Sequence, residues 1–577
     1  MLDASIESSY VARSTAANSR NLYDSYIRAI RWATDRIGDS GVIAYVSNGA
    51  WLDSNSADGL RLALADEFST LYVFNLRGNQ RTAGELSRKE GGKIFGSGSR
   101  NTVAILIAVK NPRHAGPCRI YYRDIGDYLT REEKLEIAKK ATLNNLEWEI
   151  VKPNAAGDWT NQRNADFVTH PPIGEKKPSV NEVTVFQTYS NGVVTSRDAW
   201  CYNYSKQELH KNISRMLHTY NEQVERVAVE GIPLEAVEND PALISWSRGL
   251  RGRLKSGRRI DLEDKIYPSM YRPFTKQFAY IDRSVNEFVG QIASMFPTPH
   301  HTNYGVYLNG INSSASFCCQ MIDTVPCFDL YGKGGQFFPR WIYEKAETPE
   351  GQFNLITHRD DVDEHGYRRI DNITNEVLAD YQSFYESAVT KDDIFYYVYG
   401  LLHSFEYRSM YAADLTKMLP RIPKVASATD FRTFVDTGQQ LATLHLGYET
   451  AEPYPLTEVV KKDAPTDVTE LYRVTKMKYG PSRDESKLIY NPWITLERIP
   501  PEAHKYMLGS RSGIDWVIDR YQIKVDKKSG IINDANDWAT EHAEPRYILD
   551  LIKRVITVSV CTVGLVSKLP KLEIVNH

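Results

Sequence analysis

Two stretches of the chain concentrate basic side chains beside glycine or aromatic residues. Residues 77–100 contain six Lys and Arg against two Glu, together with glycine-rich runs at 91–92 and 96–98. Residues 248–259 contain six basic residues and no acidic one, and aromatic residues follow at 271–280. Clustered positive charge beside aromatic rings is typical of surfaces that bind nucleic acid. A solvated loop or helix face has the same composition, so this alternative stays open for both stretches.

Motifs of several other chemistries are absent from the sequence. There is no G-x-x-x-x-G-K-[ST] loop, no H-E-x-x-H and no C-x-x-C pair, which excludes a P-loop ATPase and the common zinc and dithiol sites at the level of motifs. Gly96-Ser97-Gly98-Ser99 precedes a strand, so no helix N-terminus follows it to bind a phosphate. His300-His301 lacks further ligands at metal spacing, and Cys318-Cys319 is typical of buried packing.

Length and charge narrow the class of protein further. The 577 residues can form several domains, and 70 basic residues nearly balance 73 acidic ones, which gives a net charge of −3. This balance argues against a wholly basic nucleic-acid binder. The N-terminus has no basic and apolar signal sequence, and the apolar stretch at 555–567 is shorter than a membrane span. We therefore expect a cytoplasmic protein.

The first hundred residues alternate between helical and strand patterns. Apolar residues recur with helical spacing at 22–37 and 57–68, and short apolar runs predict strands at 42–46, 71–76 and 102–109. This order predicts an α/β sheet. No helix is expected between the last two strands, so the third strand is predicted to run antiparallel to its neighbour, at the edge of a mixed sheet. The basic stretch 77–100 then lies at the end of the sheet where α/β proteins bind ligands.

The remainder of the chain predicts a connector and a second, larger domain. A strand at 118–122 and a charged helix at 130–141 precede a loop rich in Asn, Pro and Gly, which places a boundary at residue 178. The expected domains are 1–113, 114–178 and 179–577. Strands are expected to dominate the last of these, with an aromatic hairpin over 271–282 and two helical clusters. Helices are predicted at 394–402, 405–418, 512–520 and 547–566.

Several segments, in the same order along the chain, resemble the type ISP restriction-modification enzymes. These are single polypeptides with nuclease, helicase, adenine-N6 methyltransferase and target-recognition domains. The resemblance covers almost the whole chain. The segments that carry it are YDSYIRAIRWATDRI, GVIAYVSNGAW, LYVFNLRGNQRT, GGKIFGSGSRNTVAILIAVKNP, YRPFTKQFAYIDR, FPTPHHTN, DDIFYYVYGLLHSFEYRSMYAADLTKMLPRIPK, LHLGYE, VTKMKYG and GIDWVIDRYQIKVDKKSGIINDANDWA.

The resemblance implies the C-terminal part of such an enzyme: the back half of an α/β class I methyltransferase sheet, followed by a larger mixed α+β target-recognition domain. The family's methyltransferase needs a glycine-rich turn that binds S-adenosylmethionine and an [N/D]-P-P-[Y/F] motif. The Pro-Pro pairs here, in His170-Pro171-Pro172-Ile173 and Ile499-Pro500-Pro501-Glu502, lack both the Asn or Asp and the aromatic residue. By the family's order, Met1 is expected to follow the position of that motif. We therefore expect no catalytic residue, no metal and no S-adenosylmethionine bound by this chain alone.

The resemblance also implies roles for individual residues. In the family, the loop before the last hydrophobic strand faces an adenine flipped out of the DNA, and an aromatic residue stacks on it. Phe95 stands at the matching position, and its ring would replace the stacking of an extruded base. Anchoring its loop in the core is the alternative role of Phe95. Phosphate contacts near the flipped nucleotide are implied for Arg77, Arg81 and Arg100. In the recognition domain, DNA contacts are implied for Arg248, Arg251, Arg253, Lys255, Arg258, Arg259, Tyr271 and Arg272.

These inferences lead to one main hypothesis and three alternatives. The chain is expected to recognise a sequence in double-stranded DNA, beside an incomplete adenine-N6 methyltransferase that is inert by itself. A second polypeptide carrying the missing methyltransferase half, helicase and nuclease would complete an enzyme that uses S-adenosylmethionine. The alternatives are a truncated remnant without activity, a complete methyltransferase with a divergent motif, and a non-enzymatic scaffold that binds proteins. No membrane partner is expected.

Overall fold

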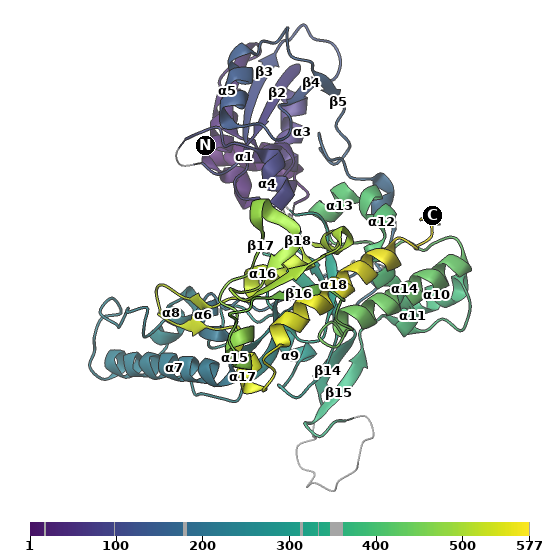
Figure 1. Cartoon of the computed structure of the whole chain (residues 1–577). Helices are drawn as coiled ribbons and strands as arrows, with labels where there is room; N and C mark the ends of the chain where they lie inside the picture. Colours follow the sequence, from purple (N-terminus) through teal and green to yellow (C-terminus); the bar gives the residue numbers. More distant parts are fainter. Residues whose placement is uncertain are drawn as a thin grey trace. The chain divides into compact units, whose positions relative to one another are not determined.

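The computed structural model describes residues 1–16, 19–82, 84–96, 99–176, 182–311, 315–332, 334–346 and 362–575. The chain forms two compact units (Figure 1). Unit 1 is Met1–Thr169 with the short segments Ile311–Ser316 and Met410–Pro420, and unit 2 is His170–Gly310, Phe317–Ser409 and Arg421–His577. The domain boundary expected at residue 178 lies outside the described residues.

Unit 1 is built on a mixed five-stranded sheet in the order β1-β3-β2-β4-β5. Its strands are β1 (Gly41–Asn48), β2 (Thr70–Arg77), β3 (Val103–Lys110), β4 (Arg119–Asp124) and β5 (Glu149–Val151). β3 runs antiparallel to both β1 and β2, whereas β2 and β4 are parallel. The expected antiparallel direction of the third strand is confirmed, but its expected place at the sheet edge is wrong. The apolar run of β3 gains most in a central position, where both edges are paired and both faces are covered.

Helices of unit 1 surround this sheet and bury an apolar core. They are α1 (Leu2–Ser9), α2 (Ser25–Thr34), α3 (Asp58–Glu67), α4 (Gly84–Glu90), α5 (Arg131–Lys140) and α13 (Ala412–Lys417). The helix expected over 22–37 is shorter, because a 3-10 turn at Arg20–Tyr23 precedes α2. α4 lies inside the stretch 77–100, which was expected to be a loop throughout. β4, β5 and α5 come from 114–178, so the structure places most of this expected connector in unit 1.

A buried carboxylate joins the segment Met410–Pro420 to the rest of unit 1. Asp158 is almost fully buried and accepts from Lys417 Nζ at 3.0 Å and from Arg163 Nε at 2.8 Å. Arg61 Nη2 lies 3.6 Å from the same carboxylate. Burial alone would raise the pKa of Asp158, but the hydrogen bonds from Arg163 and Lys417 outweigh it and lower the pKa. The ion pair between Asp158 and Lys417 thus joins Met410–Pro420 to the N-terminal part of unit 1.

Unit 2 mixes sheets with long helices. Among its described residues, three four-stranded sheets have the orders β11-β10-β13-β6, β12-β8-β9-β7 and β16-β19-β18-β17. Their strands are β6 (Ser190–Asn191), β7 (Tyr202–Asn203), β8 (Ile266–Arg272), β9 (Thr275–Tyr280), β10 (Gly305–Asn309), β11 (Cys319–Ile322), β12 (Val325–Pro326), β13 (Gly335–Pro339), β16 (Thr457–Val460), β17 (Lys478–Gly480), β18 (Asp484–Ile489) and β19 (Ile494–Glu497). The two-stranded pairs are β14 (Trp341–Lys345) with β15 (Tyr367–Asp371), β20 (Met507–Leu508) with β21 (Arg511–Ser512), and β22 (Lys524–Val525) with β23 (Ile532–Asn533).

Helices contain more of the described residues of unit 2 than strands do, so the expected dominance of strands is wrong. The helices are α6 (Asp198–Cys201), α7 (Lys206–Ala228), α8 (Arg248–Lys255), α9 (Ile292–Met295), α10 (Asn375–Phe384), α11 (Lys391–His403), α12 (Phe405–Met410), α14 (Ala428–Leu446), α15 (Val468–Tyr472), α16 (Gly513–Arg520), α17 (Asn536–Glu541) and α18 (Tyr547–Val566). α11 and α14 meet at two glycines: a Cβ added to Gly438 would lie 1.9 Å from the Tyr396 carbonyl oxygen. None of the described helices has the length and apolar character needed to cross a membrane.

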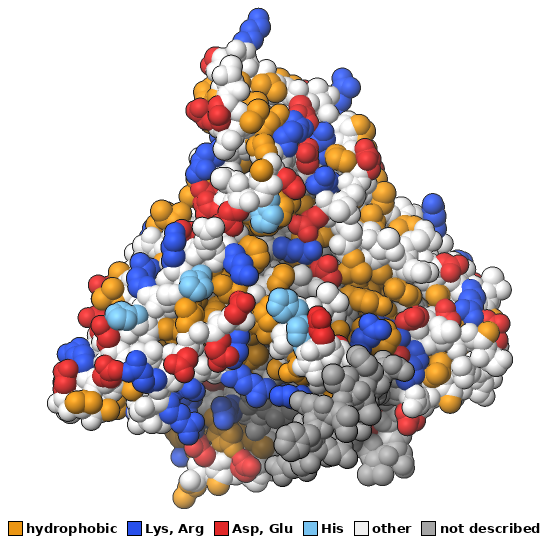
Figure 2. Space-filling view, turned by 90° about the horizontal axis from the view of Figure 1, so that it is seen from below, with side chains coloured by type: hydrophobic (Ala, Val, Ile, Leu, Met, Phe, Trp, Pro, Cys, Tyr) orange, Lys and Arg blue, Asp and Glu red, His pale blue; other side chains and the backbone are white. Residues whose placement is uncertain are grey.

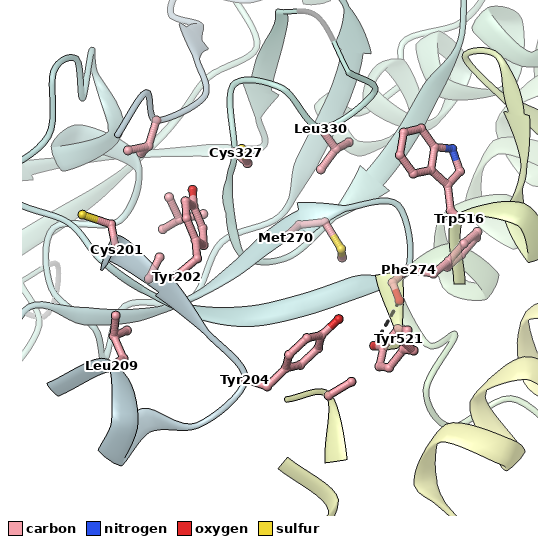
Figure 3. Close-up of a cluster of buried hydrophobic side chains, with 14 of the residues drawn as sticks. Cys201, Tyr202, Tyr204, Leu209, Met270, Phe274, Cys327, Leu330, Trp516 and Tyr521 are labelled. Atoms are coloured by element: carbon pink, nitrogen blue, oxygen red, sulfur yellow. Dashed lines mark hydrogen bonds between the residues drawn. The ribbon is translucent and has the colours of Figure 1, made fainter. Parts of the chain in front are cut away.

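The core of unit 2 is rich in tyrosine. Tyr202, Tyr204 and Tyr521 are at most 3% exposed and pack around the hairpin of β8 and β9 (Figure 3). The hydroxyl of Tyr521 donates to the Phe274 carbonyl oxygen at 3.3 Å, at the turn of this hairpin. Phe274 has a φ of +54°, and its ring is fully buried. The hairpin predicted over 271–282 is confirmed, and its aromatic residues belong to the core.

Candidate nucleic-acid interface

The basic stretch of unit 1 begins with an arginine that is committed to internal carboxylates. Arg77 ends β2 in the left-handed region, and its Nε lies 2.7 Å from Asp124. A second ion pair joins it to Asp127. The phosphate contact of Arg77 stays a prediction; in the structure two acidic partners share its charge. Arg77 stabilises the start of the loop that follows β2.

Ile94, rather than Phe95, anchors the stretch 77–100. Ile94 is 7% exposed and packs in a small cluster with Phe74 and Val103, whereas Phe95 is 46% exposed. The Ile94 carbonyl oxygen accepts from Arg131 Nε at 3.0 Å. The alternative prediction was that Phe95 anchors its loop in the core. In the structure Ile94 is the anchor instead. Contacts of Ile94 hold this loop against unit 1, and the ring of Phe95 remains accessible to a ligand.

Backbone contacts bring the ends of this stretch together. The Gln80 amide donates to the Arg100 carbonyl oxygen at 2.8 Å, and its side chain donates to the Gly91 carbonyl oxygen at 3.0 Å. Arg81 and Arg100 are both exposed and form no ion pair within the described ranges. The structure thus groups Arg81, Arg100 and Phe95 on one loop region. Ser97 and Gly98, from the glycine-serine run, lie outside the described residues.

In unit 2, much of the basic stretch 248–259 forms an amphipathic helix, α8. Ser247 caps it by accepting from the Leu250 amide at 3.3 Å, and Leu250 and Leu254 are buried. Arg248, Arg251 and Lys255 fall on the opposite, exposed face because helical neighbours are three or four residues apart. We call these three residues the α8 basic face. The composition of the stretch indicated their charge, but the helix itself was not predicted.

The remaining basic residues of this stretch have different surroundings. Arg258 is exposed, as is Arg259, which pairs with Glu225. Arg253 belongs to α8 and is partly buried. Within the α8 basic face, Arg251 donates to Asn239 at 2.7 Å and lies 5.0 Å from the centre of the Trp246 ring. Arg248, Lys255 and Arg258 have no ion-pair partner in the part of the chain that the structure describes.

The hairpin residues predicted to face DNA lie below the surface. Arg272 is 9% exposed, and its Nη1 contacts Cys327 Sγ at 3.2 Å. Tyr271 is partly buried, and its hydroxyl donates to Asp198 at 3.1 Å. The prediction of a direct contact is corrected for Arg272, since a buried guanidinium cannot reach a surface duplex. Tyr271 keeps an accessible edge in a cavity.

Other charged residues around that cavity were not identified from the sequence. Arg520 and Lys524 line the cavity, and Arg511 shares Asp519 with Arg520; all three lie far from Tyr271 in sequence. No local signal could have identified them as a group. Figure 2 shows one face of the molecule, on which Lys and Arg alternate with Asp and Glu over much of the surface. The described residues contain no group of three or more His, Cys, Asp or Glu placed to hold a metal ion.

Comparisons with known proteins agree on one family. The model of the Type ISP C-terminal specificity domain matches residues 184–551. The chain is similar to the solved structure of a nuclease-deletion mutant of the Type ISP restriction-modification enzyme LlaGI in complex with a DNA substrate mimic, with 38% identity and a TM-score of 0.84 over 100% of this chain and 50% of that one. It is also similar to the ATP-dependent Type ISP enzyme LlaBIII bound to DNA, with 34% identity and a TM-score of 0.84 over 99% and 35% of the two chains.

A third solved structure, the DrdV–DNA complex, has 30% identity and a TM-score of 0.81 over 99% of this chain and 54% of that one. The chain therefore spans about half the length of these proteins or less. No curated protein matches it.

Proposed function

Because the chain belongs to the family of Type ISP restriction-modification enzymes, we propose that its unit 2 selects a specific sequence in double-stranded DNA. The observation that carries the proposal is the α8 basic face, an exposed row of cations inside the region that matches the specificity domain. Phosphate contacts from such residues position a protein on a duplex, and other side chains then contact the base edges. The similar LlaGI, LlaBIII and DrdV structures contain DNA or a DNA mimic, which supports this choice of partner.

For unit 1 we propose the back half of an adenine-N6 methyltransferase domain. β3 follows β1 and β2 along the chain but lies between them in the sheet. Its antiparallel direction to both strands agrees with such a role. The exposed ring of Phe95 is suited to stack on an adenine that leaves the duplex, since an extruded base needs a new apolar contact. Arg81 and Arg100 are then placed on the same loop region to contact neighbouring phosphates.

The turn after β1 does not fit S-adenosylmethionine. The turn after β1 is closed by packing: a Cβ added to Gly49 would lie 3.2 Å from side-chain atoms of Ala104 and Thr102. Trp51, in the same turn, is fully buried. This turn leaves no cradle for the cofactor, so we derive no methyl-transfer step for the chain. A polypeptide region with the missing motifs is required to complete the enzyme.

A selection from a pool of random double-stranded DNA tests the recognition function. The purified chain should enrich one sequence, and its affinity should fall steeply as the salt concentration rises, because phosphate contacts release counterions. Binding without enrichment would refute sequence recognition. Salt-insensitive binding to a protein, with no binding to DNA, would favour the scaffold alternative.

A methylation assay on mixed-sequence DNA tests the proposal for unit 1. The chain alone should transfer no methyl group from S-adenosylmethionine. Robust transfer by the purified chain would show that a divergent catalytic motif is present and that unit 1 is complete.

A further inference from the structure

Unit 2 contains a cavity of about 350 Å³ that neither α8 nor Phe95 contributes to. It lies between α6, the hairpin of β8 and β9, and the pair β22–β23. Tyr202 and Tyr204, drawn in Figure 3, form part of its wall. The polar side chains that matter for its chemistry are Tyr271, Gln277, Arg520, Lys524 and Asn533.

Two cations, Arg520 and Lys524, line this cavity together with two carboxylates, and the guanidinium groups of Arg272 and Arg511 lie behind it. Arg272 is buried behind Tyr271 and has no carboxylate within ion-pair distance among the described residues. Arg520 lies 2.6 Å from Asp519, but Asp519 is shared with Arg511 at 2.7 Å. Lys524 is exposed at the edge of the cavity and forms no ion pair with any described residue. Partial desolvation and then the nearby Arg520 lower the pKa of Lys524, as expected for an amine held among guanidinium groups.

The two carboxylates that line the cavity accept hydrogen bonds from neutral donors, and among the described residues neither forms an ion pair with Arg520 or Lys524. Asp198 accepts from the hydroxyls of Tyr271 and Thr195. Asp526 accepts from the backbone amides of Lys528 and Ser529 in its own turn. The cations at the edge therefore lack a full set of acidic partners, and such an arrangement favours an anionic ligand.

The size and the polar lining of the cavity define that ligand further. A volume of about 350 Å³ exceeds the needs of a bare phosphate and is in the range of small-molecule sites. Gln277 and Asn533 supply side-chain amide groups on the wall. Asn533 Nδ2 donates to Gln277 Oε1 at 3.3 Å. Amides of this kind pair with the edges of nucleobases.

We propose that this cavity binds one nucleotide unit, with its phosphate on Lys524 and Arg520 and its base toward Gln277 and Asn533. The inference rests on the proposed function, because a DNA strand is the expected source of the nucleotide. A free nucleotide offers the same chemistry, and the experiment separates the two sources. Binding here involves no covalent step.

Two variants of the whole chain test the cavity. Lys524→Gln removes the exposed cation, and Ala199→Leu fills space in the cavity without changing charge. The matched control is Lys527→Gln, which neutralises one exposed lysine on the turn between β22 and β23, outside the cavity. Affinity for the selected double-stranded DNA and its salt dependence are measured for each variant. Binding of free deoxyadenosine monophosphate is followed by saturation-transfer NMR.

Lys524→Gln should weaken DNA binding about tenfold, the effect of one charge-assisted contact. It should also lower the slope of log affinity against log salt by about one. Ala199→Leu should weaken DNA binding as well, while the control should bind DNA like the wild type. DNA affinity could be unchanged in both variants while the mononucleotide signal seen with the wild type is lost in both. That result would support a nucleotide site whose ligand is a free nucleotide.

Two results together would overturn the inference. Lys524→Gln and the control would change DNA affinity equally, and Ala199→Leu would remove no mononucleotide signal. In that case sequence-selective DNA binding by the wild type would still support the proposed function. Conversely, disappearance of the mononucleotide signal in the two variants supports the site even if the wild type selects no DNA sequence.

Discussion

At the scale of single residues, neighbours in sequence have opposite environments at positions 94 and 95. Ile94 points into a small apolar cluster that also contains Leu76 and Ile125, and Phe95 is exposed. Both are large apolar residues, so hydrophobicity alone could not distinguish the anchor from the residue that is available to a ligand. The distinction decides which of the two can stack on a base.

Substitution of the two residues should affect stability very differently. Ile94→Ala should lower the free energy of unfolding by about 2 kcal/mol, because a buried side chain is truncated. Phe95→Ala should change it by less than about 0.5 kcal/mol, as is usual for exposed positions. Urea unfolding of both variants checks this. A larger decrease for Phe95→Ala than for Ile94→Ala would contradict the assignment of Ile94 as the anchor.

The arginines of the candidate interface also differ residue by residue. Arg77 is paired with two Asp residues and Arg272 is buried, although both belong to basic or aromatic stretches that suggested DNA contact. Burial and pairing depend on residues distant in the chain, such as Asp124 for Arg77. Sequence composition therefore identified two basic stretches but could not show which of their members are paired or buried.

At the scale of elements, α8 turns a basic run into a directional surface. Its two buried leucines fix which side faces the core, and the α8 basic face then points outward. The helix was not predicted because its two glycines and the lack of a longer apolar pattern gave no clear helical signal. A capping serine and tertiary packing stabilise it instead.

Removal of charge from α8 should weaken DNA binding specifically. Arg248→Gln/Lys255→Gln should lower the slope of log affinity against log salt by about two, because each substitution removes one cation that binds a phosphate. The control Lys461→Gln/Lys462→Gln removes the same charge from exposed residues of unit 2 after β16. Fluorescence anisotropy with labelled duplex at several salt concentrations gives the slopes. Equal slopes for the two variants would show that α8 makes no special contribution.

The loop that carries Phe95 depends on a glycine at its base. Gly91 has a φ of +66°, and an added Cβ would lie 2.1 Å from the Leu129 carbonyl oxygen. Gly96, by contrast, has open space where a Cβ would be added.

Gly91→Ala should therefore lower the free energy of unfolding by more than about 1 kcal/mol, whereas Gly96→Ala should be nearly neutral. Limited proteolysis should cut the stretch 77–100 faster in Gly91→Ala alone. Similar stability and cleavage of the two variants would mean that the loop is not held against the segment before α5.

At the scale of the whole molecule, three helices of unit 2 share a buried histidine. His445 of α14 contacts the Tyr399 hydroxyl of α11 at 2.5 Å and Thr562 of α18 at 2.8 Å. Burial lowers the pKa of His445 to about 3, and it lowers the pKa of the neighbouring His403 well below its usual value. Both are neutral when folded at neutral pH.

This burial predicts how stability depends on pH. Below pH 6.5 the unfolded chain binds protons at these histidines while the folded chain does not, so stability falls as the pH is lowered from 6.5 toward 3. Well below pH 6.5, each histidine that stays neutral in the folded chain should decrease the free energy of unfolding by up to about 1.4 kcal/mol per pH unit, and for His445 this holds down to its folded pKa of about 3. His445→Gln should remove about half of this pair's contribution, since one of the two groups no longer titrates. Urea unfolding between pH 7.5 and 4.5 measures both slopes, and identical slopes would contradict the prediction.

The sequence by itself determined the family, the N-terminal order of helices and strands, and the two basic stretches. These depend on local patterns: apolar periodicity predicted α2 and α3, and short apolar runs predicted β1, β2 and β3, because each buries its own regular set of side chains. Only the tertiary structure decided the central place of β3, the inclusion of Met410–Pro420 in unit 1, and the cavity at Lys524. These features arise from contacts between residues tens to hundreds of positions apart, and no local pattern records which distant partner will neutralise a charge, cover a face or complete a wall.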